Sequence, residues 1–480
     1  MPPRKSTIYF LSLGPLILAI FFLQAYAQEE ELFLHPRHMK FPPLSFTPPK
    51  PERIQLSNGL ILYLLEDPEL PLINLSALIR SGSVYDPPQL SGLASLTATV
   101  LRTGGTTRQS PQAINEELEF MGAHLEFSMG RESAGIHLSV PQKNFRRALN
   151  ILADLLINPG FDPEQIDLAK KQEIENIRRS NDDPEEIAYR EFRRALYREN
   201  PRGQIPTIES IARIKREDLI SFHRRFFKPN NTILGISGDF KRAEMLTLLE
   251  ETLGRWERSL IELPLIPPPT RADNKMIFYV PKDLPQATIL LGHLSLPLGH
   301  PDYIPFKVLN FILGGGGFNS RLVQEIRSNQ GLAYNVGSFY QGRVDYGVFG
   351  AFCQTKSSAT HKVISLIYET INNLKQQAPT AAELDWAKKA LVNKYIFSFA
   401  TAASIVSQRM QIEYDQMPSD FLEKYPDLVA AVGLSDLERV ASKYLLPEKS
   451  ILLVVGKEED FEKPLSALGP VHKISLPKYE

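Results

Sequence analysis

Side chains that commonly bind catalytic metals are sparse in this 480-residue chain. It has one cysteine, Cys353, and its nine histidines form neither an H-x-x-E-H nor an H-E-x-x-H motif. Those motifs place two imidazoles one helical turn apart, beside a glutamate that activates water. His35 and His38 lie close together, but in a proline-rich segment that is not helical, so we interpret them as a solvated pair. The sequence predicts no metal site and no cofactor in this chain.

Nucleotides and nucleic acids are also unexpected ligands. The glycine run 314–317 is followed by Phe318, Asn319 and Ser320, whereas a phosphate-binding loop requires Gly-Lys-Ser/Thr. The 54 Lys and Arg residues are balanced by 55 Asp and Glu residues. This balance supplies no broad positive surface for a phosphate backbone, so we expect no nucleic-acid partner.

The N-terminus has the pattern of a secretory signal. Two basic residues precede an apolar run at 8–23, and the small residues Ala25 and Ala27 stand where a signal peptidase cleaves. An uncleaved membrane anchor is the alternative, but a glycine and a proline interrupt a run that is already short for a bilayer. We therefore predict a signal peptide at 1–27 and a periplasmic mature chain, starting at Gln28, with no membrane association.

The rest of the chain contains an internal repeat. Residues 161–171 resemble residues 379–389, and further matches keep the same spacing. An offset of 218 residues relates each pair: Ala169 with Ala387, Asp218 with Asp436, and Gly238 with Gly456. One offset over so long a stretch indicates a duplicated domain.

The repeat defines the predicted domain organisation. A proline-rich arm at 28–52 precedes an N-terminal domain at 53–260, and a linker at 261–274 leads to a C-terminal domain at 275–480. Each domain of about two hundred residues lies within the usual size range.

Alternating apolar residues predict short strands at the start of each half, and apolar residues three and four apart predict helices after them. The strands are expected at 60–65, 73–81, 275–279 and 287–294, and the helices at 144–156 and 166–179. Antiparallel strands with helices grouped on one face form an α+β fold.

Several motifs resemble the pitrilysin/insulinase peptidases. They comprise residues 82–86, 91–99 and 104–107 in the first half, and 319–327 and 331–334 in the second. The resemblance implies two homologous domains arranged as half of a clam-like chamber. In that family a helix in the first domain carries H-x-x-E-H, and a glutamate on a later helix completes the zinc site.

The zinc-binding positions are replaced. The alignment places Ser95 and Thr99 where the family has histidines and Ala98 where it has the catalytic glutamate. Asn176, beside Glu175, occupies the third-ligand position. A hydroxyl does not substitute for imidazole as a zinc ligand, and alanine cannot accept a proton. We therefore expect no catalytic residue in this chain and no peptidase activity from it alone.

A second family motif is retained. Arg327 and Tyr334 have the spacing at which the family's arginine holds a substrate carbonyl and its tyrosine hydrogen-bonds the developing oxyanion. A helix ending at Arg327, a turn at Gly331 and a strand at 334–340 are expected to position them. Both residues are thus predicted to bind substrate.

The resemblance implies a partner, because some family members are pairs in which one chain binds zinc and the other supplies the arginine and tyrosine. The leading hypothesis is a non-catalytic subunit of a periplasmic heterodimeric metallopeptidase that acts on peptides, with zinc in the partner. The alternative is a structural or peptide-binding protein without a peptidase partner. Glycines 314–317 fit either a substrate loop or a tight connection.

Overall fold

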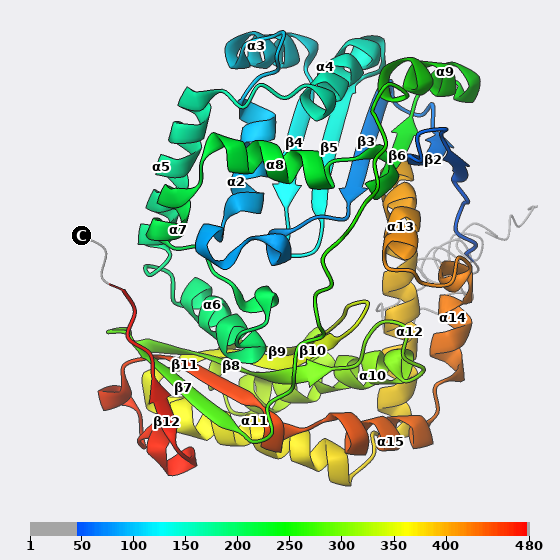
Figure 1. The fold of residues 1–480 in the computed structure, drawn as a ribbon. Helices are drawn as coiled ribbons and strands as arrows, with labels where there is room; N and C mark the ends of the chain where they lie inside the picture. Colours follow the sequence, from blue (N-terminus) through cyan, green and yellow to red (C-terminus); the bar gives the residue numbers. More distant parts are fainter. Residues whose placement is uncertain (1–45, 478–480) are drawn as a thin grey trace, which may run out of the picture. The chain divides into compact units, whose positions relative to one another are not determined.

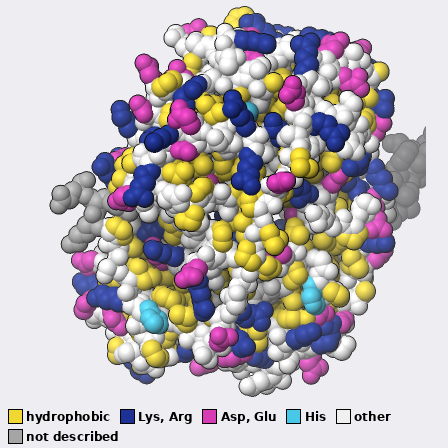
Figure 2. All heavy atoms as spheres, in the orientation of Figure 1, with side chains coloured by type: hydrophobic (Ala, Val, Ile, Leu, Met, Phe, Trp, Pro, Cys, Tyr) yellow, Lys and Arg dark blue, Asp and Glu magenta, His cyan; other side chains and the backbone are white. Residues whose placement is uncertain are grey.

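The computed structural model describes residues 46–477, so the predicted signal peptide and most of the arm, with His35 and His38, lie outside the described residues. Residues from Thr47 onward form one compact unit. On the face drawn in Figure 2, acidic and basic side chains are interspersed over this unit.

Two six-stranded sheets, one in each half, organise the chain (Figure 1). The first sheet has the order β1-β2-β6-β3-β5-β4 and the second β12-β7-β11-β8-β10-β9. The strands are β1 (Glu52–Gln55), β2 (Ile61–Glu66), β3 (Leu72–Ile79), β4 (His124–Met129), β5 (Ala134–Pro141), β6 (Thr232–Gly238), β7 (Met276–Pro281), β8 (Gln286–Ser295), β9 (Ala333–Gly342), β10 (Gly347–Lys356), β11 (Ile451–Gly456) and β12 (Val471–Lys473).

Helices follow the strands in both halves, as expected for an α+β fold. The first half contains α2 (Leu93–Thr103), α3 (Pro111–Met121), α4 (Phe145–Ile157), α5 (Pro163–Arg179), α6 (Pro184–Tyr197), α7 (Ile208–Arg213), α8 (Arg216–Phe226) and α9 (Arg242–Leu253). The second contains α10 (Tyr303–Asn310), α11 (Thr360–Gln376), α12 (Ala381–Phe397), α13 (Ala402–Tyr414), α14 (Phe421–Ala431) and α15 (Leu434–Tyr444).

The predicted elements are present, with ends shifted by up to three residues. β2, β3, β7 and β8 correspond to the four expected strands, and α4 and α5 to the two expected helices. The largest shift is at the start of α5, which begins at Pro163 rather than Ile166. Asp162 caps it by accepting hydrogen bonds from the backbone N–H groups of Glu164 and Gln165. The cap, rather than the first apolar residue, determines where this helix begins.

The sheets are not wholly antiparallel, which departs from the expectation. β6 pairs parallel with β2, and β7 pairs parallel with both β11 and β12. β6 and β11 are reached only after long helical segments, and each enters the interior of its sheet. Helical crossovers of this length permit parallel neighbours, whereas hairpins do not.

Helices cover both faces of each sheet, because the two halves exchange one helix. α13 packs on β6 and β2 through Val406 and Met410, which contact Tyr63 and Ile233. In the other direction, α6 packs on β11 and β8 of the second sheet (Figure 1). The prediction of helices on one face therefore holds only for the helices that pack on the sheet of their own half.

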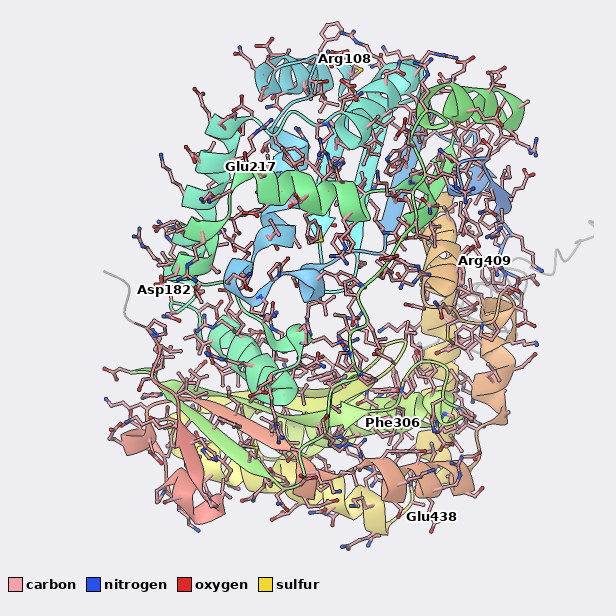
Figure 3. All side chains as sticks on the ribbon, in the orientation of Figure 1. Arg108, Asp182, Glu217, Phe306, Arg409 and Glu438 are labelled. Atoms are coloured by element: carbon pink, nitrogen blue, oxygen red, sulfur yellow. The ribbon has the colours of Figure 1, made fainter. Side chains whose placement is uncertain are left out.

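The exchange follows the sequence repeat. α6 begins at Pro184 and α13 at Ala402, which are again 218 residues apart, and their N-cap residues Asp183 and Thr401 keep the same offset. Arg409 on α13, labelled in Figure 3, is 8% exposed and bonds Glu423 of α14 through Nη2 and Oε1, 2.6 Å apart. This ion pair joins the exchanged helix to its own half.

The connection between the halves, residues 254–275, contains no helix or strand. Among residues 46–477 no single helix has the length and apolarity of a membrane span. α12 and α13 reach that length and apolarity only when they are taken together, across a 112° bend.

Candidate functional site

The helix that corresponds to the family's zinc helix is α2, and a buried carboxylate anchors its start. Asp86 accepts hydrogen bonds from the backbone N–H of Gly92 at 2.8 Å and of Ala94 at 2.9 Å. Burial raises the pKa of Asp86 to about 7, although these hydrogen bonds lower it. Asp86 is a structural residue of this region that the sequence analysis did not identify.

The three replaced positions on α2 occupy different environments. Ala98 is buried, Ser95 is half-buried and Thr99 is exposed. The Thr99 hydroxyl donates a 3.1 Å hydrogen bond to the Ser95 carbonyl oxygen, one turn back in the same helix. These side chains therefore serve the helix itself and present no metal-binding group.

α5 packs against α2, so the structure brings together the two helices that would share a zinc ion. Asn176 on α5 is exposed, and its amide nitrogen lies 3.4 Å from a carboxylate oxygen of Glu173. The adjacent Glu175 forms ion pairs with Arg178 and Arg179. The carboxylates nearest the third-ligand position are thus engaged within their own helix.

Zinc does not fit these residues. Two hydroxyls, a methyl group and an amide replace the two imidazoles, the general base and the carboxylate ligand of a zinc peptidase. Among residues 46–477, no three His, Cys, Asp or Glu side chains are grouped so that they could hold a metal ion. No metal-dependent step is therefore assigned to this chain.

Arg327 and Tyr334, in contrast, are in contact in the structure. Arg327 lies in a π-helical segment, Val323–Asn329, and Tyr334 lies near the start of β9. Gly331, with φ of 63°, turns the chain between them. The guanidinium carbon of Arg327 lies 5.4 Å from the Tyr334 ring centroid. The helical segment, the turn and the strand that were predicted around this pair are therefore present.

Phe318 completes this group and was not predicted. The Arg327 guanidinium carbon lies 4.8 Å from the Phe318 ring centroid, so it contacts two aromatic rings. Phe318 is 64% exposed and Tyr334 83% exposed. Within the described part of the chain, Arg327 forms no ion pair. Its N–H groups can therefore donate to a ligand while the rings restrict its orientation.

The glycine run that precedes Phe318 is closely packed. A Cβ atom at Gly314 would lie 2.4 Å from the backbone nitrogen of Ser338 in β9. A Cβ atom at Gly316 would lie 2.4 Å from the ring of Trp386 in α12. These contacts favour the interpretation of the run as a tight connection, which seats a π-helical turn, Phe311–Gly315, against its neighbours.

The two groups of predicted residues lie in different halves. Ser95, Ala98, Thr99 and Asn176 are on helices of the first half, whereas Arg327 and Tyr334 belong to the second. No hydrogen bond or ion pair recorded for residues 46–477 links the groups. The half-buried arginine and the exposed tyrosine can bind a peptide carbonyl and an oxyanion.

Known proteins are similar to this chain in sequence. Residues 64–207 match the model of insulinase, peptidase family M16, and residues 213–391 match the model described as the peptidase M16 inactive domain. A protein of Rickettsia felis named an uncharacterized zinc protease is 28% identical over 66% of this chain and 75% of its own length. The Helicobacter pylori protein named non-peptidase homolog YmxG is 26% identical, over 79% of this chain and 88% of its own.

A solved structure confirms the fold. The peptidase M16 inactive domain from Pseudomonas fluorescens superposes with a TM-score of 0.80 and 23% identity, covering 86% of this chain and 99% of that one. The two family models together cover about two thirds of the sequence, and the second begins at residue 213, within the first half, and extends into α12 of the second. The chain belongs to peptidase family M16, and its second half matches the domain of that family that is described as inactive.

Proposed function

We propose that this chain is the non-catalytic, substrate-binding subunit of a heterodimeric zinc metallopeptidase that degrades or processes peptides. The observation that carries the proposal is the contrast between the two groups. The positions of the zinc site hold no ligand, whereas the half-buried Arg327 and the exposed Tyr334 are in contact with each other, and Arg327 has no ion-pair partner among the described residues.

Each retained side chain has a distinct task in this proposal. The Tyr334 phenol would donate a hydrogen bond to the oxyanion that develops on the scissile carbonyl oxygen when a water adds to the peptide bond. The Arg327 guanidinium donates to a neighbouring substrate carbonyl and positions the peptide. Both groups are aligned before the reaction, because Arg327 contacts the rings of Phe318 and Tyr334.

The second candidate is a structural or peptide-binding protein without a peptidase partner. The name of the Helicobacter pylori relative, a non-peptidase homolog, is consistent with it. Retention of the arginine and tyrosine favours the first function, because a purely structural role requires neither group to be exposed.

The proposed site of action is the periplasm. The basic start, the apolar run at 8–23 and the small residues before Gln28 are the basis for this proposal. N-terminal sequencing of the mature protein is expected to begin at Gln28. Recovery of Met1 in a membrane fraction would support an uncleaved anchor instead.

The decisive experiment is reconstitution with a zinc-bearing M16 chain encoded beside this one. Cleavage of an unfolded peptide is expected only when both chains are present. Tyr334→Phe should lower turnover by about a hundred- to a thousand-fold without disturbing assembly, since an oxyanion donor acts in the transition state. The matched control is Tyr303→Phe, because no hydrogen bond from its hydroxyl is recorded among the described residues. Near-normal turnover of the Tyr334→Phe complex would favour the second candidate.

A further inference from the structure

A cavity of about 680 Å³ lies between α6 of the first half and the sheet of the second. Its apolar wall is formed by Phe192 and Leu196 of α6, Phe339 of β9, and Val348 and Phe352 of β10. These side chains pack with the residues through which α6 contacts the second sheet. The cavity therefore lies at the junction of the two halves, on the face of the sheet that α6 covers.

Arginines line the other side of this cavity. Arg193 is on α6, and Arg131 is in the turn between β4 and β5. Neither forms an ion pair with a carboxylate in residues 46–477, and the Nε atom of Arg193 is buried without a hydrogen-bond acceptor. Arg131 lies over the ring of Tyr197, 5.5 Å from its centroid. Arg193 and Arg131, together with Arg343, which also lines the cavity, thus form no ion pair with a carboxylate of the described residues.

The surrounding arginine and glutamate are already engaged. Arg190, also at the cavity, donates to Ser180, Asn181 and Glu191. Glu191 in turn is shared between Arg190 at 2.9 Å and Arg194 at 3.9 Å. The carboxylate closest in sequence to Arg193 therefore forms its ion pairs with other arginines, although its negative charge still raises the pKa of Arg193.

The acidic residues of the cavity are clustered at the opposite end of α6. Asp183 caps the helix by accepting from the backbone N–H of Glu185, and the Glu185 carboxylate accepts from Gln354 of β10. Glu186, the remaining carboxylate, precedes Arg193 by seven residues, or about 10 Å along the helix axis. The cavity is acidic at the start of α6 and basic at its end.

The basic end carries an electrostatic cost in the isolated chain. Burial and, to a smaller extent, the positive charge of Arg131 lower the pKa of Arg193 to about 10. A buried charge without a partner is unfavourable, and a bound anion would offset the repulsion between the guanidinium groups. The aromatic wall beside the guanidinium groups would take an apolar group of the same ligand.

We propose that this cavity binds a carboxylate of a peptide, held by Arg193 and Arg131, with the adjoining residue of the peptide against Phe339 and Phe352. The carboxylate is either the C-terminus or the side chain of an aspartate or glutamate. This inference rests on the proposed function in taking a peptide as the ligand. β9 runs from Tyr334 to the cavity residue Phe339, about 16 Å of extended chain, so one bound peptide of modest length can reach both.

The test measures binding to this chain alone, by fluorescence anisotropy with one labelled peptide in three forms. The first has a free C-terminus and glutamine as its penultimate residue. The second is amidated and has glutamate there. The third is amidated with glutamine and carries no carboxylate. The first or the second is expected to bind at least about ten-fold more tightly than the third, which identifies the source of the carboxylate. Equal binding of all three forms would overturn the proposal.

Substitutions then locate the binding site. Arg193→Met and Arg131→Met should each reduce the preference for a carboxylate by about ten-fold. Arg194→Met is the control, because Arg194 is exposed on the same helix and does not line this cavity. Since Arg193 has no ion-pair partner among the described residues, its loss should not lower the melting temperature. A carboxylate preference that survives both substitutions would contradict the assignment.

The failure of this inference can be distinguished from that of the proposed function. Arg193→Met should abolish the carboxylate preference of the isolated chain, whereas Tyr334→Phe should reduce cleavage by the two-chain complex, so the two proposals are tested by different measurements. Loss of cleavage with equal binding of all three peptides would leave the proposed function standing and eliminate the carboxylate site.

Discussion

The guanidinium carbon of Arg327 lies 4.8 Å from the ring centroid of Phe318, which follows the glycine run directly. This contact connects the retained arginine to a residue that is mostly exposed and has no evident role in the core. The closely packed glycines before Phe318 hold the segment that carries it in place. Phe318 therefore acts as a positioning residue for Arg327.

Phe318→Ala is expected to raise the KM of the reconstituted complex by about two- to five-fold, the value of one exposed cation–π contact. Turnover should fall less, because Tyr334 remains in place. Arg327→Ala should raise KM further and also lower kcat/KM. Phe120→Ala, at an aromatic residue 84% exposed on α3, is the control. Unchanged KM values for Phe318→Ala would remove its positioning role.

The purified chain is expected to retain no stoichiometric zinc after dialysis, because Ser95, Thr99 and Asn176 do not replace the family's ligands. α2 and α5 are nonetheless packed together. A combined variant, Ser95→His, Ala98→Glu, Thr99→His and Asn176→Glu, should therefore gain about one zinc ion per chain. Metal analysis of both proteins checks this prediction. Equimolar zinc in the unaltered chain would contradict the interpretation of the site.

Stability is expected to fall in acid because of His293, which is 1% exposed on β8. Its Nδ1 lies 2.9 Å from the Leu294 carbonyl oxygen, and its Nε2 accepts from the backbone N–H of Leu446. Burial lowers the pKa of His293 to about 4, below the unfolded value of about 6.5. The unfolded chain then binds more protons, so stability is lost as pH falls from about 6.5 to about 4, by up to ~3 kcal/mol.

Urea unfolding between pH 4 and pH 7 measures this loss. His293→Gln should reduce the pH dependence, since an amide can donate and accept without titrating. Some dependence should remain from His223, for which burial also lowers the pKa to about 4. His124→Gln, at an exposed site, is the control substitution. The same slope in the His293→Gln protein as in the unaltered protein would assign the acid sensitivity elsewhere.

Gly235→Ala is expected to destabilise the chain by about 1–3 kcal/mol. A Cβ atom at this position in β6 would lie 2.3 Å from both Met410 and Val406 of α13, so the exchanged helix would have to move. Gly299→Ala is the matched control, because no atom lies within 4 Å of its added Cβ. Denaturant midpoints compare the two variants. Similar midpoints would mean that α13 does not require this close approach.

Local patterns in the sequence were sufficient to predict the strands, the helices and the repeat. Leu62 and Leu64 of β2 face the first core, and their neighbour Tyr63 packs beneath α13. This alternation is visible in the sequence as a strand. Which helix covers Tyr63 is not, because α13 lies more than three hundred residues away and only tertiary structure brings it there.

The candidate site was predictable only where its residues are close together in the sequence. Arg327 and Tyr334 are linked by a short helix–turn–strand motif, so their contact follows from local structure. The pairing of Arg193 with Arg131 at one cavity depends on a helix and a distant turn. In the sequence Arg193 is one of several arginines in a polar helix, and its lack of a counter-charge becomes apparent only when its surroundings are known.

The exchange of α6 and α13 has a consequence for how such a chain can arise. A single half, expressed alone, would expose the apolar face of its sheet and carry a helix with no surface to cover. A second copy of the same half would satisfy both needs, so an ancestral gene of half the length is expected to have encoded a symmetric homodimer. In the present chain the two halves are covalently joined, so each exchanged helix is held close to the sheet that it covers whatever the protein concentration.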